Sequence, residues 1–314
     1  MGEAKRKRPS PMPSSEAVSR IVEALDVLFI ACGCRDTRRV HDPDPELLGN
    51  FAVVDGDLSV CDGRKVILFV HGYNVTTSEA LKSAEDFFSK VQAGLLRDEV
   101  ELDDYVFVLF TWPGDVGPLW FDAAQNLAHA SGVGLYRLAT ALRTNGATRV
   151  TLVTHSLGVH VGLRSAAILG ERRIRKNSPA HYDAVLLLAP AIENDVFRRP
   201  KLFDRYHFPE SAFGMSWLHI FSSRADDVLK KAFSASEFDR ALGYSGPESM
   251  KPLKSLSDRS LAVFADPSKR FQFELHDFSP QSATIMNPKL FVHGHSHYWE
   301  EQDQVNYYIN LMGD

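Results

Sequence analysis

The chain has 314 residues, of which 44% are hydrophobic and 24% are charged, and its net charge is −5. This length can hold one large α/β domain, and the acidic balance argues against a nucleic-acid partner, because nucleic-acid-binding proteins are usually basic. The basic run at residues 5–8 (KRKR) is the exception, and prolines and serines follow it. Residues 1–20 are therefore predicted to be a disordered tail, and residues 21–314 a single domain.

Two features of the sequence bear on the cellular compartment. No apolar run approaches the roughly 18 residues of a membrane-spanning helix, and no apolar stretch follows the basic N-terminus as in a signal peptide. The cysteines, Cys32, Cys34 and Cys61, are too few and too irregularly spaced for a disulfide framework. We expect a cytoplasmic protein with no integral membrane segment, and we interpret the cysteines as small core residues.

Short apolar runs alternate with amphipathic segments, which is typical of a mostly parallel sheet covered by helices. The run at 65–70 (KVILFV) is nearly continuous in apolar residues, as in a strand buried on both faces. Apolar residues recurring at three and four predict helices that begin near Thr76, Phe121 and Gly158, and we expect a closing helix over 298–311. The predicted strands cover residues 26–34, 65–70, 105–110, 149–154, 182–189, 217–222 and 271–275.

Local signals refine several of these segments. Thr76 and Glu79 have the spacing of a capping box at the start of a helix. Gly146 fits the position just beyond the end of the helix predicted from Phe121 to Thr144. Two irregular, aromatic-rich segments, 197–215 and 233–265, either form a cap over a pocket or lie on the surface as plain excursions.

A candidate nucleophile lies in residues 154–158 (THSLG), between an apolar strand and a helix-compatible stretch. A serine on such a strand-to-helix turn is a nucleophile when a base takes its proton, whereas the simpler alternative is a serine that only caps a helix. Thr154 replaces the more usual glycine, but the surrounding strand and helix favour Ser156 as the nucleophile. The N–H of Leu157 would then be one oxyanion donor at the positive end of a helix.

A second loop could supply the other oxyanion donor. Residues 71–74 (HGYN) follow the strand at 65–70, where Gly72 permits a sharp turn and Tyr73 offers its backbone N–H. The alternative is a glycine-containing loop without function. We expect four residues to border the substrate pocket, although the last two fit a core role equally well: His71, Gly72, Trp112 and His155.

The order of the motifs HGYN, TWPG (111–114) and THSLG resembles the α/β-hydrolase superfamily. More narrowly, it is similar to a poorly characterised bacterial group of serine esterases that carry a His-Gly-Tyr-Asn loop. The resemblance covers about residues 26–312. It implies an α/β-hydrolase fold, with a mostly parallel central sheet, helices on both faces and short cap-like insertions. It also implies an order of serine, acid and histidine along the chain.

The resemblance indicates where the acid of a catalytic triad should lie. The pattern Asp-x-Val-Leu after the strand at 217–222 is similar to the acid turn of the family and selects Asp226. Asp227 is the neighbouring alternative, and both could simply be solvated acids at the start of a helix. Glu193 and Asp195 occupy a second acid position known in the superfamily.

The base should come from residues 292–298 (VHGHSHY). The family pattern Gly-His-Ser followed by an aromatic residue selects His295, whose Nε2 would take the proton of Ser156. Histidines spaced by two could instead chelate a metal ion, so His293, His295 and His297 form a rival cluster. The run Gly-His-Ser-His resembles the last metal motif of calcineurin-like metallophosphoesterases. The sequence lacks the Asp-x-His and Gly-Asn-His motifs that this family needs in addition. We therefore expect no metal and no cofactor.

These patterns together predict a serine hydrolase that cleaves a small-molecule carboxylic ester through an acyl-enzyme on Ser156. Amides, thioesters and lactones use the same machinery. Two alternatives remain open at this point. One is a catalytically inactive hydrolase-fold protein that acts in binding or as a scaffold, and the other is a metal-dependent hydrolase built on the histidine cluster.

Overall fold

The computed structural model describes residues 28–34, 50–117, 119–200, 206–233, 240–280, 290, 292 and 294–312. Within this part of the chain, eight strands form one sheet in the order β2-β1-β4-β3-β5-β6-β7-β8. Every neighbouring pair is parallel except β1 and β2, so β2 is an antiparallel edge strand. The strands are β1 (Leu28–Cys34), β2 (Phe51–Asp55), β3 (Lys65–Val70), β4 (Tyr105–Thr111), β5 (Arg149–His155), β6 (Tyr182–Leu188), β7 (Met215–Ser222) and β8 (Gln272–Asp277).

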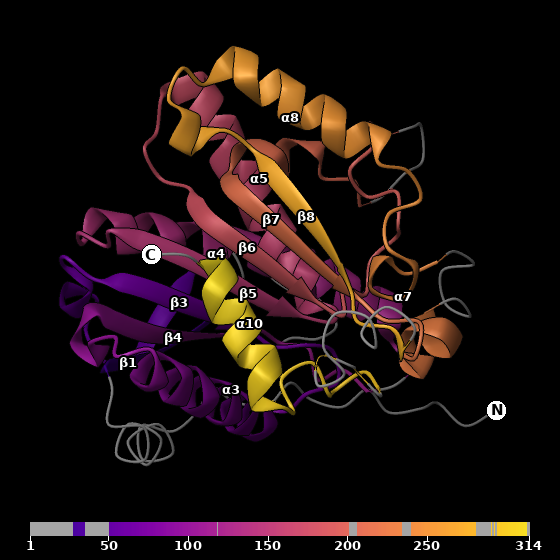
Figure 1. Ribbon diagram of the computed structural model, residues 1–314, viewed down its shortest axis with the longest axis horizontal. Helices are drawn as coiled ribbons and strands as arrows, with labels where there is room; N and C mark the ends of the chain where they lie inside the picture. Colours follow the sequence, from indigo (N-terminus) through magenta and orange to yellow (C-terminus); the bar gives the residue numbers. More distant parts are fainter. Residues whose placement is uncertain are drawn as a thin grey trace.

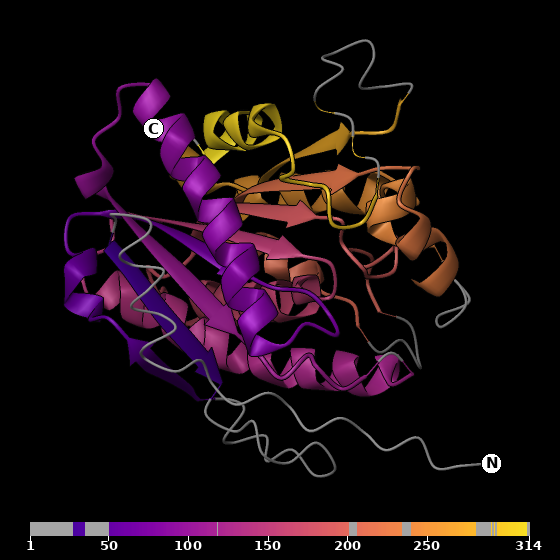
Figure 2. The ribbon, with the colours of Figure 1, turned by 90° about the horizontal axis from the view of Figure 1, so that it is seen from below.

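Helices cover both faces of the sheet (Figures 1 and 2). The helices α3 and α10 pack together on one face, and α4 and α5 pack together on the other. Each of the described helices falls short of the combination of length and apolarity that crossing a membrane requires. The helices are α3 (Thr77–Arg97), α4 (Phe121–Thr144), α5 (Gly158–Lys176), α7 (Leu242–Ser245), α8 (Lys251–Val263) and α10 (Gln302–Met312).

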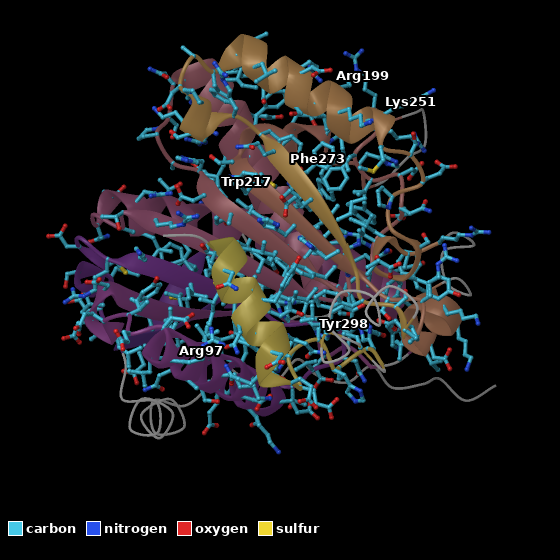
Figure 3. All side chains as sticks on the ribbon, viewed as in Figure 1. Arg97, Arg199, Trp217, Lys251, Phe273 and Tyr298 are labelled. Carbon is cyan, nitrogen blue, oxygen red and sulfur yellow. The ribbon has the colours of Figure 1, made fainter. Side chains whose placement is uncertain are left out.

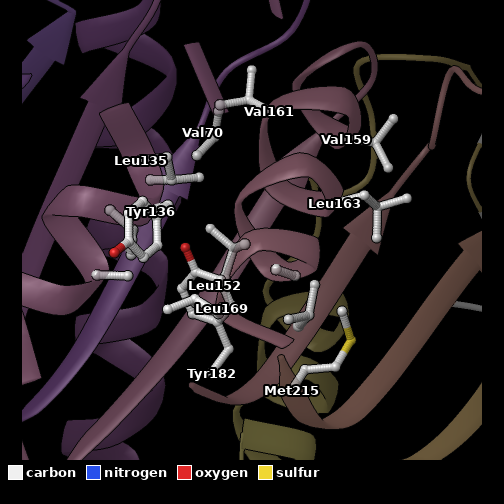
Figure 4. Close-up of a cluster of buried hydrophobic side chains, with 14 of the residues drawn as sticks. Val70, Leu135, Tyr136, Leu152, Val159, Val161, Leu163, Leu169, Tyr182 and Met215 are labelled. Atoms are coloured by element: carbon white, nitrogen blue, oxygen red, sulfur yellow. The ribbon is translucent and has the colours of Figure 1, made fainter. Parts of the chain in front are cut away.

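The alternation of side chains along each strand divides the interior into two cores. In β3, Leu68 and Val70 join the core under α4 and α5, whereas Ile67 and Phe69 join the core under α3 and α10. Figure 4 shows part of the first core, in which Tyr182 lies among aliphatic side chains. Apolar burial on both faces explains why the central strands read as continuous hydrophobic runs.

Several sequence predictions are confirmed in detail. The strand at 65–70 and the helix over 121–144 have the predicted bounds. Thr76 caps α3, its side chain accepts from the N–H of Glu79, and the Glu79 carboxylate accepts from the N–H of Thr76. Gly146 has a φ of 86°, as expected of a glycine just past a helix end.

Other predictions of individual elements need correction. The short strand β2 was not predicted, because its residues are only half-buried and show no clear alternation. The closing helix begins at Gln302 rather than at residue 298. Tyr298 and Trp299 precede it as loop residues, and their apolar character reflects burial against the α3 and α10 core rather than a helical face.

The predicted tail at residues 1–20 lies outside the described residues. In the first irregular segment, Pro209–Phe213 form a 3₁₀ helix against α5. In the second, α8 buries Leu253 and Leu256 in the core shared with α4 and α5. The 3₁₀ helix and α8 therefore both pack on the face of the sheet that α5 covers.

Candidate active site

Three side chains from distant parts of the chain meet beyond the carboxyl ends of β5, β7 and β8. The hydroxyl Oγ of Ser156 lies 2.7 Å from Nε2 of His295. The other ring nitrogen of His295, Nδ1, lies 2.8 Å from Oδ2 of Asp226, whose side chain is fully buried. Carboxylates accept only, so Nδ1 carries the proton donated to Asp226, and Nε2 can accept the proton of Ser156. The structure therefore brings the three predicted residues into one hydrogen-bonded chain.

Ser156 occupies a strained turn between β5 and α5. Its φ is 54°, in the left-handed region that residues other than glycine rarely adopt. Its N–H donates to the carbonyl oxygen of Leu188 at 3.0 Å, and its own carbonyl accepts from Ala191 at 3.2 Å. The segment after β6 thus fixes the backbone of the turn and keeps the Oγ of Ser156 directed at His295.

Two glycines allow the turn at Ser156 to pack directly on the loop at 71–74. A Cβ atom on Gly158 would lie 2.5 Å from the carbonyl oxygen of His71. A Cβ atom on Gly72 would lie 2.9 Å from Cβ of Ser156. Real Cβ atoms do not make contacts this short, because repulsion rises steeply below van der Waals distance. The close approach of the two loops therefore requires glycine at both positions.

The unusual threonine at the first position of the motif is accommodated from the helix side. A Cβ atom on Gly162, one turn into α5, would lie 2.7 Å from Cγ2 of Thr154. The space for the threonine methyl group therefore exists because residue 162 has no side chain. The motif usually has its glycine on the strand, whereas here the glycine that makes room is residue 162 of the helix.

The two predicted oxyanion donors lie on the loop at 71–74 and the turn at Ser156, which pack closely together. Within the described part of the chain, neither the N–H of Tyr73 nor that of Leu157 donates to a protein acceptor. The Tyr73 side chain is anchored away from the loop, since its hydroxyl donates to the carbonyl of Gly117 and its ring packs edge-on against Phe121. Both N–H groups therefore remain able to bind an oxyanion.

The side chains of His71 and Trp112 hold the backbone of the loop at 71–74 in place through hydrogen bonds. Burial lowers the pKa of His71 to about 4, so its imidazole is neutral at neutral pH. Its Nδ1–H donates to the carbonyl of Gly72 at 3.0 Å, and its Nε2 accepts from the N–H of Trp112 at 3.1 Å. The indole N–H of Trp112 donates to the carbonyl of His71 at 2.8 Å. These bonds assign both side chains a positioning role beneath the loop.

His155 contacts the segment that carries His295, the candidate base. Its Nε2–H donates to the carbonyl of His295 at 2.9 Å, and its ring packs edge-on against Trp299. Burial, together with repulsion from the His295 imidazole, lowers the pKa of His155 to about 3. A neutral His155 therefore acts as a fixed hydrogen-bond donor to the segment holding the base.

The candidate acid, Asp226, is held by its own turn. Oδ1 of Asp226 accepts from the N–H of Leu229 at 3.0 Å, which leaves Oδ2 for His295. The hydroxyl of Ser223, at the start of this turn, lies 3.3 Å from the carbonyl of Val292, which it can reach as a donor. The acid turn and the segment before His295 are thereby joined.

The other acid candidates have different partners. The Asp227 side chain is 65% exposed and pairs with Lys231 at 2.8 Å. Asp195 pairs with Arg198 and with His207, and Glu193 lies in an isolated bridge with Ala241. The described contacts of His295 therefore favour Asp226 over these three alternatives.

The base segment is also anchored to the last helix. Tyr298, labelled in Figure 3 near the carboxyl ends of the strands, is fully buried, and its carbonyl accepts from the hydroxyl of Tyr308 in α10. Nδ1 of His297 lies 3.3 Å from Oε2 of Glu300. His293 lies outside the described residues, so the rival cluster of three histidines is only partly described. Among the described residues, the group that could hold a metal ion is instead His219, Glu274 and His276.

A cavity of about 390 Å³ opens beside the loop at 71–74. Its inner wall includes the aromatic rings of Phe69 and Trp299, next to Gly72. Its rim carries polar and charged side chains of α3, including Lys82 and Asp86. Two further predicted pocket residues, His71 and His155, also line it. The cavity thus combines an aromatic wall with a charged rim.

Comparison with known proteins agrees with this architecture. The family model described as "Alpha/beta hydrolase of unknown function (DUF900)" matches residues 50–267. No curated protein matches the sequence significantly. Together with the strand order, the family match confirms the predicted α/β-hydrolase fold.

Solved structures of similar fold include several esterases. Esterase PE8 is 15% identical, with 80% of this chain and 94% of that chain covered and a TM-score of 0.44. Esterase B from Lactobacillus rhamnosis is 13% identical, with 83% and 77% covered and a TM-score of 0.40. The Pyrococcus furiosus esterase Pf2001 is 14% identical, with 88% and 98% covered and a TM-score of 0.36. At these identities and TM-scores, no conclusion about this chain is drawn from the likeness.

Proposed function

The chain belongs to the family of α/β hydrolases of unknown function, and from this premise we propose that it is a serine hydrolase. The substrate class is a carboxylic ester or a related acyl compound, cleaved through an acyl-enzyme on Ser156. One observation carries the proposal: Ser156, His295 and Asp226 form an unbroken hydrogen-bonded chain of 2.7 and 2.8 Å. A serine that only capped a helix would not need a histidine and a buried carboxylate in line with its hydroxyl.

The geometry supports a two-step acyl transfer. Nε2 of His295 takes the proton of Ser156 as Oγ attacks the carbonyl carbon, while Asp226 keeps the proton on Nδ1 and stabilises the imidazolium. The tetrahedral oxyanion accepts from the N–H groups of Tyr73 and Leu157. His295 then gives its proton to the departing alcohol. Water, deprotonated by the same imidazole, releases the acid product from Ser156.

The adjoining cavity favours a small substrate. Its volume of about 390 Å³ lies near the lower end of ligand pockets. Its rim includes Glu79, Lys82 and Asp86, and an alkyl chain laid across these charges would displace their water without replacing its hydrogen bonds. We therefore expect faster hydrolysis of acetyl and butyryl esters of p-nitrophenol than of the palmitoyl ester.

A fluorophosphonate probe tests the nucleophile directly, because it forms a covalent adduct with an activated serine. We expect the wild-type protein to be labelled on Ser156, as mapped by peptide mass spectrometry, and Ser156→Ala to remain unlabelled. The same substitution should reduce kcat on p-nitrophenyl butyrate by a factor on the order of 10⁶.

Two results would contradict the proposal. A folded wild-type protein that neither labels nor hydrolyses any of these esters would favour an inactive binding or scaffold protein. Full hydrolysis by Ser156→Ala that disappears with a chelator would favour the metal-dependent alternative. Thermal unfolding of both proteins is the control, because it shows that the substitution has not removed the fold.

A further inference from the structure

Three side chains of types that can bind a metal ion converge on the neighbouring strands β7 and β8, outside the candidate active site. His219 of β7 pairs in register with Glu274 of β8, and His276 lies two residues further along β8. Residues two apart in a strand share one face, so Glu274 and His276 point to the same side. That face also carries α10, and Figure 3 labels Trp217 there. No local pattern in the sequence indicates this group, because it forms only when β7 and β8 pair.

The three potential ligand atoms already have the spacing of a metal site. Nδ1 of His219 lies 3.2 Å from Nε2 of His276. Oε2 of Glu274 lies 3.7 Å from the first of these nitrogens and 3.8 Å from the second. Tetrahedral zinc with bonds of about 2.0–2.1 Å places its ligand atoms roughly 3.4 Å apart. The triangle observed here therefore matches one face of such a tetrahedron with little rearrangement.

The neighbouring side chains hold both imidazoles in place. Trp217 stacks on His219, with ring centroids 5.7 Å apart and planes inclined by 6°. Phe221 stacks on His276, with centroids 4.4 Å apart. The hydroxyl oxygen of Tyr307 in α10 lies 3.0 Å from Nδ1 of His276. Metal-binding histidines usually donate their second ring N–H to such an outer acceptor.

The second ring nitrogen of His219 also suits metal binding. Nε2 of His219 is buried and has no hydrogen-bond partner in the described part of the chain. This nitrogen can carry the ring proton when Nδ1 binds a metal ion.

We propose that His219, Glu274 and His276 bind one Zn²⁺ ion through Nδ1, Oε2 and Nε2, with water as the fourth ligand. Two imidazoles with one carboxylate suit zinc, whereas Mg²⁺ and Ca²⁺ prefer oxygen ligands alone. The Glu274 side chain is 48% exposed, so the site opens to solvent on the side where the ion would enter. The ion would fasten the edge strand β8 to β7. β7 leads directly to the turn that carries Asp226. The carbonyl of Phe278, one residue past β8, accepts from the N–H of Val292 in the segment before His295. Zinc would therefore stabilise the support of the proposed acid and base.

The test uses the full chain, freed of metal by dialysis against a chelator and titrated with Zn²⁺ by isothermal calorimetry. We expect one equivalent to bind to the wild-type protein and to raise its Tm, because a ligand that binds the folded state stabilises it. Glu274→Gln should weaken binding at least tenfold and abolish the rise in Tm. This variant suits the test because Glu274 is half-exposed and its removal leaves no buried gap.

Glu300→Gln is the matched control, because Glu300 is also half-exposed and also contacts a histidine, His297. It should bind zinc as the wild type does. Cobalt substitution adds a second readout, since a tetrahedral site gives visible absorption that Glu274→Gln should lose. The proposal is overturned if the wild type binds less than 0.2 equivalents, if Glu274→Gln binds equally well, or if Glu300→Gln loses the zinc. The last result would locate the metal in the 293–297 loop instead.

Discussion

The two halves of the candidate active site are held together by different interactions. The nucleophile half, residues 71–74 and 154–158, relies on backbone packed against backbone. A Cβ atom on Gly158 would lie 2.5 Å from the carbonyl oxygen of His71. The acid–base half, residues 223–229 and 294–299, relies on polar side chains. Asp226 reaches His295 across 69 residues of sequence by a single hydrogen bond of 2.8 Å.

This difference indicates what each half tolerates. In the nucleophile half, an added methyl group meets backbone atoms that can move only if a whole loop moves. In the acid–base half, the backbone has room among the described residues, since a Cβ atom on Gly294 would meet none of their atoms closer than 3.8 Å. There the identity of one polar atom decides the geometry, because the imidazole of His295 needs the matching acceptor to fix its tautomer. Steric changes should therefore damage the first half, and isosteric polar changes the second.

Among the changes that compare the two halves, the largest effect is expected from an isosteric change in the acid–base half. Asp226→Asn keeps the shape and the acceptor for Leu229, but its amide can leave Nδ1 of His295 without an anionic partner. We expect kcat on p-nitrophenyl butyrate to fall by about 10⁴-fold, with KM little changed.

Asp227→Asn is the matched control for this prediction. Its side chain is 65% exposed and its ion pair with Lys231 lies on the surface. Such pairs contribute little, so we expect activity within about twofold of wild type. Equal rates for the two variants would move the acid away from Asp226, and Glu193 and Asp195 would be tested next.

The next largest effect is expected from a steric change in the nucleophile half, which should distinguish the two halves most clearly. Gly158→Ala should drive the turn at Ser156 away from the loop at 71–74 and displace the N–H of Tyr73 from the oxyanion. Loss of one oxyanion donor costs about 10²- to 10³-fold in kcat, and we expect a loss of this size.

Gly294→Ala places the same methyl group one residue from the base. Its Cβ atom has space among the described residues, and its φ lies outside the left-handed region. We expect kcat within about threefold of wild type, measured beside Gly158→Ala on the same ester. A comparable loss in both variants would show that backbone packing does not distinguish the halves.

The same contrast explains how much the sequence could predict. The nucleophile half is local, so its glycines, serine and flanking strand all appear within short motifs that the sequence displays at 71–74 and 154–158. The central strands were also predictable, because burial on both faces leaves continuous apolar runs. Asp226 and His295 were assigned through a resemblance, since nothing near either residue indicates its partner.

Features that depend on pairing between distant segments escaped prediction. The edge strand β2 is half-buried and leaves a weak pattern. The group of His219, Glu274 and His276 exists only because β7 and β8 align in one register. The positioning roles of His71 and Trp112 likewise depend on contacts between the residues that follow β3 and those that follow β4. Periodicity reports which face is buried, but it does not report which residue of another strand lies opposite.

The contact between Gly162 of α5 and Thr154 of β5 also depends on packing between two elements. A double-mutant cycle can test it. Gly162→Ala should gain up to about 1 kcal/mol from helix propensity, yet its methyl group would lie 2.7 Å from Cγ2 of Thr154. We expect a net loss of about 1–2 kcal/mol in the free energy of unfolding, as for other overpacked cores. Thr154→Ser removes Cγ2, and in that background Gly162→Ala should be neutral or stabilising. Urea unfolding of the four proteins gives the coupling energy, which should be about 1–2 kcal/mol. A coupling near zero would mean that the strand and the helix adjust independently, and that the threonine at the first motif position needs no glycine opposite it.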